Sequence, residues 1–127
     1  MIASLASVAS AAPAASVADS LSVSVDVVTR TTVTVTVTVV GRLDAARCPE
    51  LRSEINRLIA EGCQALVIDL HESTFIDSVG LAALVKAMRD SADAGAEFWL
   101  IRPEQDDAMR VFKLSKFDSI FDMRRRT

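Results

Sequence analysis

The stretch that decides the fold reads ALVIDL at residues 65–70, HEST at residues 71–74 and FIDSVGL at residues 75–81. Its first six residues form an almost continuous apolar run, which is typical of a central strand covered on both faces. Its last seven residues lead into a pattern in which apolar residues recur at helical spacing. The stretch therefore predicts a buried strand, a short connection and a helix.

This stretch also places a serine hydroxyl at the start of the predicted helix, which we expect to run from about Ser78 to Ala92. Asp77 is a natural N-cap, because a carboxylate there can accept a hydrogen bond from the first helical turn. Ser78 has no catalytic partner beside it in the sequence, so its hydroxyl is a poor nucleophile but a good phosphate acceptor. This pattern favours a switchable binding module over an enzyme. The expected buried stripe of the helix is Leu81, Leu84, Val85 and Met88.

Upstream, residues 23–28 alternate Val with Ser or Asp, and residues 32–39 read TVTVTVTV. Alternation of β-branched residues with a period of two is a strong strand signal. Only a few residues around Arg30 separate the two runs, so we expect an antiparallel hairpin. The valines should face the core and the threonines should face solvent, with helices on one side of this part of the sheet.

The segment between this hairpin and the buried strand predicts one helix. Gly41 is expected to end the second strand, and residues 44–49 lead into a helix with Pro49 in its first turn. Apolar residues follow at helical spacing, and Gly62 stops the helix. The residues of its apolar side are Leu51, Ile55, Leu58 and Ile59.

The last third of the chain predicts a strand at residues 97–101 and a third helix that starts at Pro103. A short helical piece with Phe117, Ile120 and Phe121 then closes the end of the core. The complete order is β-β-α-β-α-β-α-α, which predicts an α/β fold with a mixed sheet flanked by helices. In that sheet an N-terminal hairpin is joined by parallel strands.

Length and charge limit the classes of function. The 127 residues fit one domain, which we place at residues 22–123, after an Ala/Ser-rich extension at 1–21 and before a basic tail at 124–127. The net charge of −3 gives no electrostatic case for binding nucleic acid. The extension has no basic start for a secretory signal and is too polar to insert in a membrane. We expect a cytoplasmic protein.

Two cysteines and one histidine offer little support for redox or catalytic chemistry. If one helix carries Cys48 and Cys63, their ~15-residue separation corresponds to ~22 Å, too far for a disulfide bond within the chain. His71 is expected to be a loop residue, so neither a metal site nor Ser–His chemistry is indicated. No glycine-rich phosphate-binding motif is present. We therefore expect no cofactor, no metal and no enzymatic activity.

Four stretches together resemble one known family. They are GRLD at residues 41–44, the strand and DSVG signature at residues 66–81, the glycine and strand at residues 95–101, and the closing segment at residues 111–121. In order and spacing they are similar to the STAS domain, in its free-standing bacterial form. The resemblance covers about residues 23–123. Any one stretch alone would be a weak signal.

The resemblance implies a specific role. Such proteins are anti-sigma factor antagonists: they bind an anti-sigma factor that is itself a serine kinase, and thereby release a sigma factor. The kinase phosphorylates the serine after the signature aspartate, which is Ser78 here, and a separate serine phosphatase restores binding. Where the family often has a second Ser or Thr, this chain has Val79. The implied contact residues are Asp44, Asp77, Ser78, Val79, Gly80 and Leu81.

Several alternatives remain open. Asp77 and Asp44 can be read as cap and turn residues alone, or as residues that also contact the partner. The chain can be read as a STAS subunit that docks on the ATPase of a membrane transporter, or as a module that senses a small ligand such as a nucleotide. Oxidation of the two cysteines between molecules is a further possible input.

Overall fold

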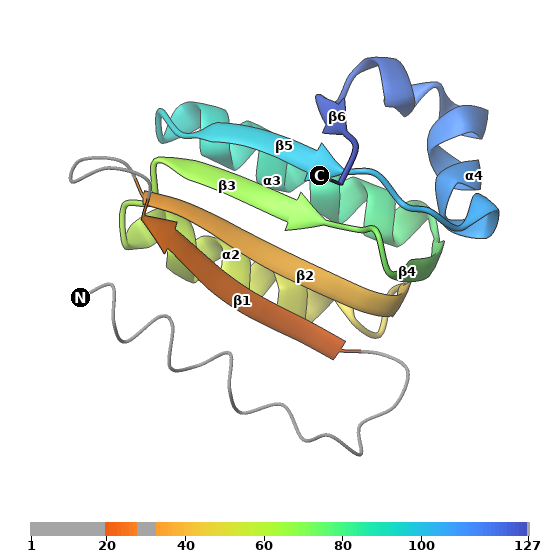
Figure 1. Ribbon diagram of the computed structural model, residues 1–127, viewed down its shortest axis with the longest axis horizontal. Coiled ribbons are helices and arrows are strands. Elements are labelled where there is room, and N and C mark those ends of the chain that lie inside the picture. The colour runs from red at the N-terminus through yellow and green to blue at the C-terminus, as the bar shows by residue number, and fades with distance from the viewer. Residues whose placement is uncertain (1–19, 28–32, 127) are drawn as a thin grey trace.

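A computed structural model describes residues 20–27 and 33–126 of the chain, with the side chains of residues 23–27 left out. The predicted turn around Arg30 and the first 19 residues of the predicted extension lie outside this part. The six strands form a mixed sheet in the order β1-β2-β3-β5-β6, with β4 paired to β2 away from this path. Figure 1 shows this twisted sheet with helices behind it.

The expected hairpin is present. Strand β1 (Ser20–Val27) pairs antiparallel with β2 (Val33–Leu43), with Leu21 opposite Val39. In β2 the alternation reads as predicted, because Val35, Val37 and Val39 are buried while the intervening threonines are partly exposed. The strand therefore presents its valines to the core and its threonines to the other face.

The predicted central strand is also confirmed. Strand β3 (Ala65–Asp69) lies between β2 and β5 (Glu97–Ile101), pairs parallel with both, and is buried along its whole length. Strand β6 (Met123–Arg124) adds to the far edge, parallel to β5. The sheet thus begins two residues before, and ends one residue after, the domain limits of 22 and 123 expected from the sequence.

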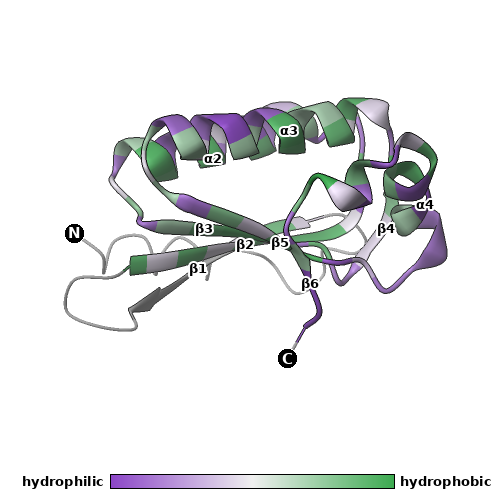
Figure 2. Cartoon of the chain, turned by 90° about the horizontal axis from the view of Figure 1, so that it is seen from above, coloured by the Kyte–Doolittle hydropathy of each residue, from purple (hydrophilic) through white to green (hydrophobic). Residues whose placement is uncertain are grey.

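Two helices cover one face of the sheet. Figure 2 shows α2 (Cys48–Ala60) and α3 (Ser78–Asp93) side by side above the strands, with α4 (Asp106–Ser115) at the end of the sheet. Pro49 lies in the first turn of α2, as expected. Leu81 and Leu84 of α3 are buried, whereas Val85 and Met88 are only partly so, and Ala83 and Ala87 complete the packed face.

One expected boundary is wrong, and it affects the site. Gly41 does not end β2: the strand continues to Leu43 through an irregularity between Gly41 and Arg42, where Gly41 has a φ of 85°. The extension pairs parallel with β4 (Ser73–Ile76), a strand that the sequence did not predict. A bulge with a left-handed glycine bends the strand without breaking it.

The C-terminal segment also differs in detail. Helix α4 begins at Asp106 with Gln105 as its N-cap, three residues after the predicted start at Pro103. After α4, the 3₁₀ helix η2 (Phe117–Ser119) leads to Phe121, which is buried edge-to-face against Phe112 at 5.8 Å between ring centroids. Ile120, expected to help close the core, is 54% exposed. In the described part of the chain, no helix is long and apolar enough to cross a membrane.

Candidate functional site

Ser78 is the first residue of α3, directly after the N-cap Asp77. Asp77 has an extended backbone, with φ −97° and ψ −176°, and its side chain accepts a 2.8 Å hydrogen bond from the backbone N–H of Gly80. This cap fixes the point where the chain turns from β4 into the helix. The side chain of Ser78 is exposed there. Its hydroxyl therefore lies at the positive end of a 16-residue helix.

The start of α3 lies directly on the bent end of β2. The backbone N–H of Asp77 donates to the carbonyl oxygen of Leu43 at 3.3 Å. A β-carbon on residue 80 would lie 2.5 Å from that same oxygen and 3.1 Å from the side chain of Ile76. Gly80 is buried at this point. Only a residue without a side chain permits so close an approach of the helix to the strand.

The sequence named Gly80 and Leu81 as contact residues, and both are buried in this structure. Gly80 positions the helix, whereas Leu81, 7% exposed, packs in the core and also lines the hollows beside Ser78. Ser78 and Val79 are exposed, and Asp77 is half-buried. The most accessible residues of the motif are therefore Asp77, Ser78 and Val79.

Asp44 follows the end of β2 and shapes the turn before α2. Its side chain accepts a 3.1 Å hydrogen bond from the backbone N–H of Ala46, and its carbonyl oxygen accepts from Arg47 and Cys48 at 3.0 Å each. Asp44 is half-buried. These bonds are typical of an aspartate that begins a turn.

The thiol of Cys48, at the first position of α2, is buried close to this region. Burial raises the pKa of Cys48, and the negative charges of Asp77 and Asp44 raise it further, against an opposing effect of Arg52. Burial is also the main cause that raises the pKa of the Cys63 thiol. Both cysteines are free thiols. A protonated, buried thiol reacts slowly with oxidants, so this region does not favour a redox switch at Cys48.

An apolar groove lies beside Ser78, between the start of α3 and the outer side of α4. Helix α4 contacts β4, which brings Val111 and Leu114 towards Phe75. Phe75 is 45% exposed and Leu114 is 75% exposed. The residues that line the groove include Phe75, Ser78, Leu81, Val111 and Leu114, together with the charged Asp107 and Arg110.

A second groove lies on the other side of Ser78. It runs along α3, where Ala82, Val85 and Arg89 line it, and Phe117 of η2 also lines it. Ser78 lines both grooves. Its hydroxyl thus lies on the rim between two partly apolar hollows, and Val79, 46% exposed, lies next to it. A protein surface that covered Ser78 could fill either hollow with apolar side chains.

The sequence did not predict these grooves. They depend on the placement of α4 against β4, whose first residues, Asp106 and Ser73, are 33 positions apart in the sequence. The sequence did not predict β4. The nearest sequence signal was Leu114, which the pattern offered, as an alternative to Val111, for the apolar side of this helix with Met109 and Phe112. In the structure Leu114 is exposed instead. Single exposed leucines are common, so this signal alone could not identify a surface.

His71 lies in the turn after β3, as a loop residue, and its side chain is mostly buried between two carboxylates. Its Nδ1 lies 2.6 Å from the Asp69 carboxylate and its Nε2 lies 3.3 Å from the Glu72 carboxylate. This arrangement ties the turn to the end of β3. Among the residues that the structure describes, no three His, Cys, Asp or Glu side chains are grouped so that they could hold a metal ion.

The STAS domain family model matches residues 24–127. An anti-sigma factor antagonist from Mycobacterium paratuberculosis is 26% identical, with a TM-score of 0.65 over 84% of this chain and 87% of that chain. SpoIIAA in its unphosphorylated form gives a TM-score of 0.67 at 22% identity, over 84% of this chain and 89% of that one. Bacillus SpoIIAA in the phosphorylated form gives a TM-score of 0.61 at 23% identity, over 84% of this chain and 92% of that one. The family match, the mixed sheet and the Asp-Ser start of α3 agree, and the chain belongs to the STAS domain family.

Proposed function

We propose that this chain is an anti-sigma factor antagonist: it binds an anti-sigma factor of the serine-kinase type, thereby releases a sigma factor, and loses this binding when Ser78 is phosphorylated. The observation that carries the proposal is the exposed hydroxyl of Ser78 on the rim between two apolar grooves. The similarity to the mycobacterial antagonist supports the general role. On this proposal the chain is a binding protein and not an enzyme.

The unmodified site suits a protein partner. Exposed Phe75, Val79 and Leu114 surround Ser78 and supply apolar area that a partner can cover. Burial of apolar surface contributes about 25 cal/mol per Å², and a few such side chains supply much of the free energy of a regulated interface. The uncharged hydroxyl of Ser78 can accept or donate a hydrogen bond within that contact.

Phosphorylation changes the balance at this point. A phosphoserine carries about −1.5 to −2 charges at neutral pH. In the free chain the N-terminus of α3 tolerates an anion and stabilises it by ~0.3–1 kcal/mol, although Asp77 opposes it. In the complex the same phosphate is desolvated against apolar groups, which costs several kcal/mol. A loss of about 3 kcal/mol lowers the affinity more than a hundredfold. The fold therefore persists while the complex dissociates.

The similar fold of SpoIIAA is consistent with this view, since that protein has been observed in both unphosphorylated and phosphorylated forms. Ser78 is the acceptor we propose for this chain, because Val79 has no hydroxyl and Ser73, the nearest serine before it, is buried. Ser73 donates its hydroxyl hydrogen bond to the carbonyl oxygen of Val39 at 3.1 Å, which leaves it inaccessible to a kinase. A serine phosphatase would reset the switch.

The test compares three variants as baits in pull-downs from the native cell, followed by mass spectrometry of the bound protein and of Ser78. Ser78→Asp adds a charge at the proposed acceptor, Ser78→Ala removes the acceptor, and Ser53→Asp adds the same charge at an exposed serine of α2. We expect wild type, Ser78→Ala and Ser53→Asp to capture a kinase-like anti-sigma factor, and Ser78→Asp to lose it.

Two outcomes would contradict the proposal. Capture of the anti-sigma factor by Ser78→Asp as strongly as by wild type would refute the switch. Recovery of the ATPase subunit of a transporter, with no anti-sigma factor, would refute the antagonist role and support the docking alternative. Thermal unfolding of each bait gives the necessary control, because all four proteins should unfold as stable domains.

A further inference from the structure

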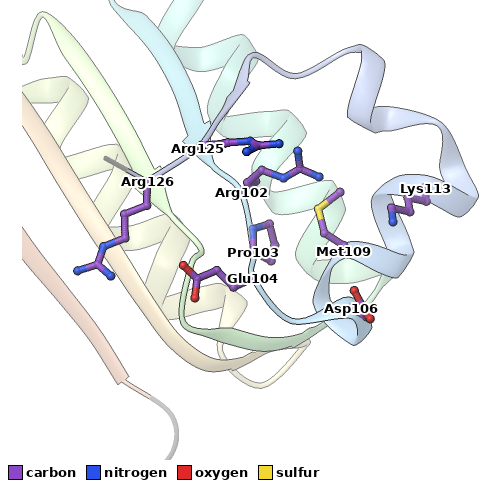
Figure 3. Close-up of a pocket in the computed structure, with 8 residues that line it drawn as sticks. All are labelled: Arg102, Pro103, Glu104, Asp106, Met109, Lys113, Arg125 and Arg126. Carbon is purple, nitrogen blue, oxygen red and sulfur yellow. The ribbon is translucent and has the colours of Figure 1, made fainter.

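A pocket of about 410 Å³ lies away from Ser78, where the end of β5, helix α4 and the residues after β6 meet. Figure 3 shows the guanidinium groups of Arg102 and Arg125 extending towards the same side, with the amine of Lys113 reaching in from α4. Three separate elements thus contribute positive charge to one pocket. The volume falls within the range that is usual for small-molecule sites.

The two arginines are neighbours because of the strand register. Ile101 pairs with Arg124 in the parallel β5–β6 ladder, and the backbone N–H of Arg102 donates to the carbonyl oxygen of Arg124 at 2.9 Å. Arg102 and Arg125 therefore directly follow the last paired residues of the two strands, and Figure 3 shows their side chains on the same side. Like charges at neighbouring cross-strand positions destabilise a sheet. A bound anion would remove this repulsion.

Two carboxylates, of Glu104 and Asp106, also line the pocket, but neither is paired with one of these cations. The side chains of Arg102, Lys113 and Arg125 form no ion pair or hydrogen bond with another described residue. Arg124, which directly precedes Arg125, does have such partners. Its guanidinium pairs with Asp122 at 2.9 Å and lies 4.0 Å from the ring centroid of Trp99. The chain therefore neutralises the arginine that faces away from the pocket and leaves the pocket's cations available.

The shape of the pocket indicates what kind of anion it takes. Paired guanidinium groups present parallel N–H donors that match the oxygens of a phosphate group. Buried Pro103 and Met109 form an apolar wall. Figure 3 shows Glu104 and Asp106 at the other end of the pocket, away from the two guanidinium groups. Carboxylates there repel a second anionic group but accept hydrogen bonds from hydroxyl or amino groups.

We propose that this pocket binds a small phosphate-bearing molecule, with its phosphate held by Arg102, Arg125 and Lys113 and its polar end towards Glu104 and Asp106. The site is separated from Ser78 by α4, whose other side lines the apolar groove. The proposal does not depend on the antagonist role. It gives this chain a ligand-binding site in addition to its protein-binding surface.

The test is isothermal titration calorimetry on the full chain at low ionic strength, with inorganic phosphate, pyrophosphate and ADP as separate probes. We expect at least one probe to bind at millimolar concentration or below. Arg125→Gln should weaken binding about tenfold to a hundredfold, as expected when charge-assisted hydrogen bonds to phosphate are lost. Arg102→Gln should have a similar effect. If ADP bound more tightly than pyrophosphate, the rest of the nucleotide would contact the end of the pocket with Glu104 and Asp106. Equal affinities would assign the binding to the phosphate groups alone.

Arg110→Gln is the matched control, because it removes the same charge from an exposed residue of α4 that lines the groove beside Ser78 and not this pocket. It should change the affinity for phosphate less than twofold, since a charge outside the pocket acts on the ligand only at long range and through solvent. Without a probe, Arg125→Gln should unfold at the wild-type temperature or above, because a like-charge neighbour is removed. Equal losses in Arg125→Gln and Arg110→Gln would overturn the site, as would binding of polyglutamate with no binding of any phosphate probe.

Discussion

The carbonyl oxygen of Leu43 lies 2.5 Å from the position that a β-carbon on Gly80 would occupy. This contact joins the bent end of β2 to the first turn of α3, and it sets the position of the Asp77–Ser78 pair. The same oxygen accepts a hydrogen bond from the backbone N–H of Asp77 at 3.3 Å. The strand end therefore holds the switch segment through the backbone, at a point where a side chain has no room.

Gly80→Ala should destabilise the chain, although alanine is the better helix former. Helix propensity alone favours the change by ~1 kcal/mol. The added methyl group meets a backbone oxygen that cannot rotate away, and overpacking of this kind costs ~1–3 kcal/mol. Because the 2.5 Å approach places the cost in the upper part of that range, we expect a net loss of up to about 2 kcal/mol in the free energy of unfolding by urea. An increase in stability would show that α3 is not held against Leu43.

Asp77 can be tested as a cap separately from its charge. Asn caps a helix about as well as Asp, whereas Ala costs ~1 kcal/mol. Because the carboxylate accepts a 2.8 Å hydrogen bond from Gly80, Asp77→Asn should retain the wild-type unfolding midpoint and Asp77→Ala should lose about that amount. If Asp77 is only a cap, Asp77→Asn should also bind the anti-sigma factor normally. Weak binding by a stable Asp77→Asn chain would instead show that the charge contacts the partner.

Local patterns in the sequence were sufficient for most of the fold. Alternation of Val and Thr in residues 33–39 set both the strand and its buried face, because this pattern depends only on the pleat of the strand. The apolar run at residues 65–69 and the Asp77 cap were equally local signals. What failed was the end of β2, where Gly41 forms a bulge rather than a turn. The partner strand β4 that stabilises this bulge lies 32 residues further on.

The site was predictable only in part, because it too depends on contacts between residues that are distant in the sequence. The position of Ser78 at a helix start follows from its neighbours in the sequence. Its place between two grooves depends on α4 and η2, which reach it through tertiary packing. The cationic pocket depends on the two-residue strand β6, which brings Arg125 beside Arg102. In the sequence alone, residues 124–126 had the pattern of a solvated tail.

Ser91→Ala should stabilise the chain. The Ser91 side chain is fully buried in α3, and its hydroxyl has no hydrogen-bond partner among the described residues. A buried, unpaired hydroxyl costs ~1–3 kcal/mol, and alanine also has a higher helix propensity. We expect a gain of about 1 kcal/mol in urea unfolding. Ser53→Ala, at an exposed position of α2, is the control and should gain only the propensity term of ~0.5 kcal/mol. Equal gains in both variants would show that Ser91 is hydrogen-bonded in solution.

Leu114→Ser tests whether the groove beside Ser78 belongs to the binding surface. Leu114 is 75% exposed, so its replacement should leave the free energy of unfolding within about 0.5 kcal/mol of wild type. If the partner covers the groove, the same change removes a buried leucine worth ~1.5–3 kcal/mol and weakens capture of the anti-sigma factor at least about tenfold.

Ile120→Ser is the matched control, because Ile120 is also an exposed apolar residue of the C-terminal segment, 54% exposed, and lines neither groove. Its replacement should leave the affinity, measured by titration of the purified partner, unchanged. If Leu114→Ser and Ile120→Ser both bind as wild type, the partner reaches Ser78 from the α3 side, where Val85 and Phe117 line the other groove. A loss in Leu114→Ser alone places the contact across α4, and the phosphate on Ser78 then acts at the centre of the interface rather than at its rim.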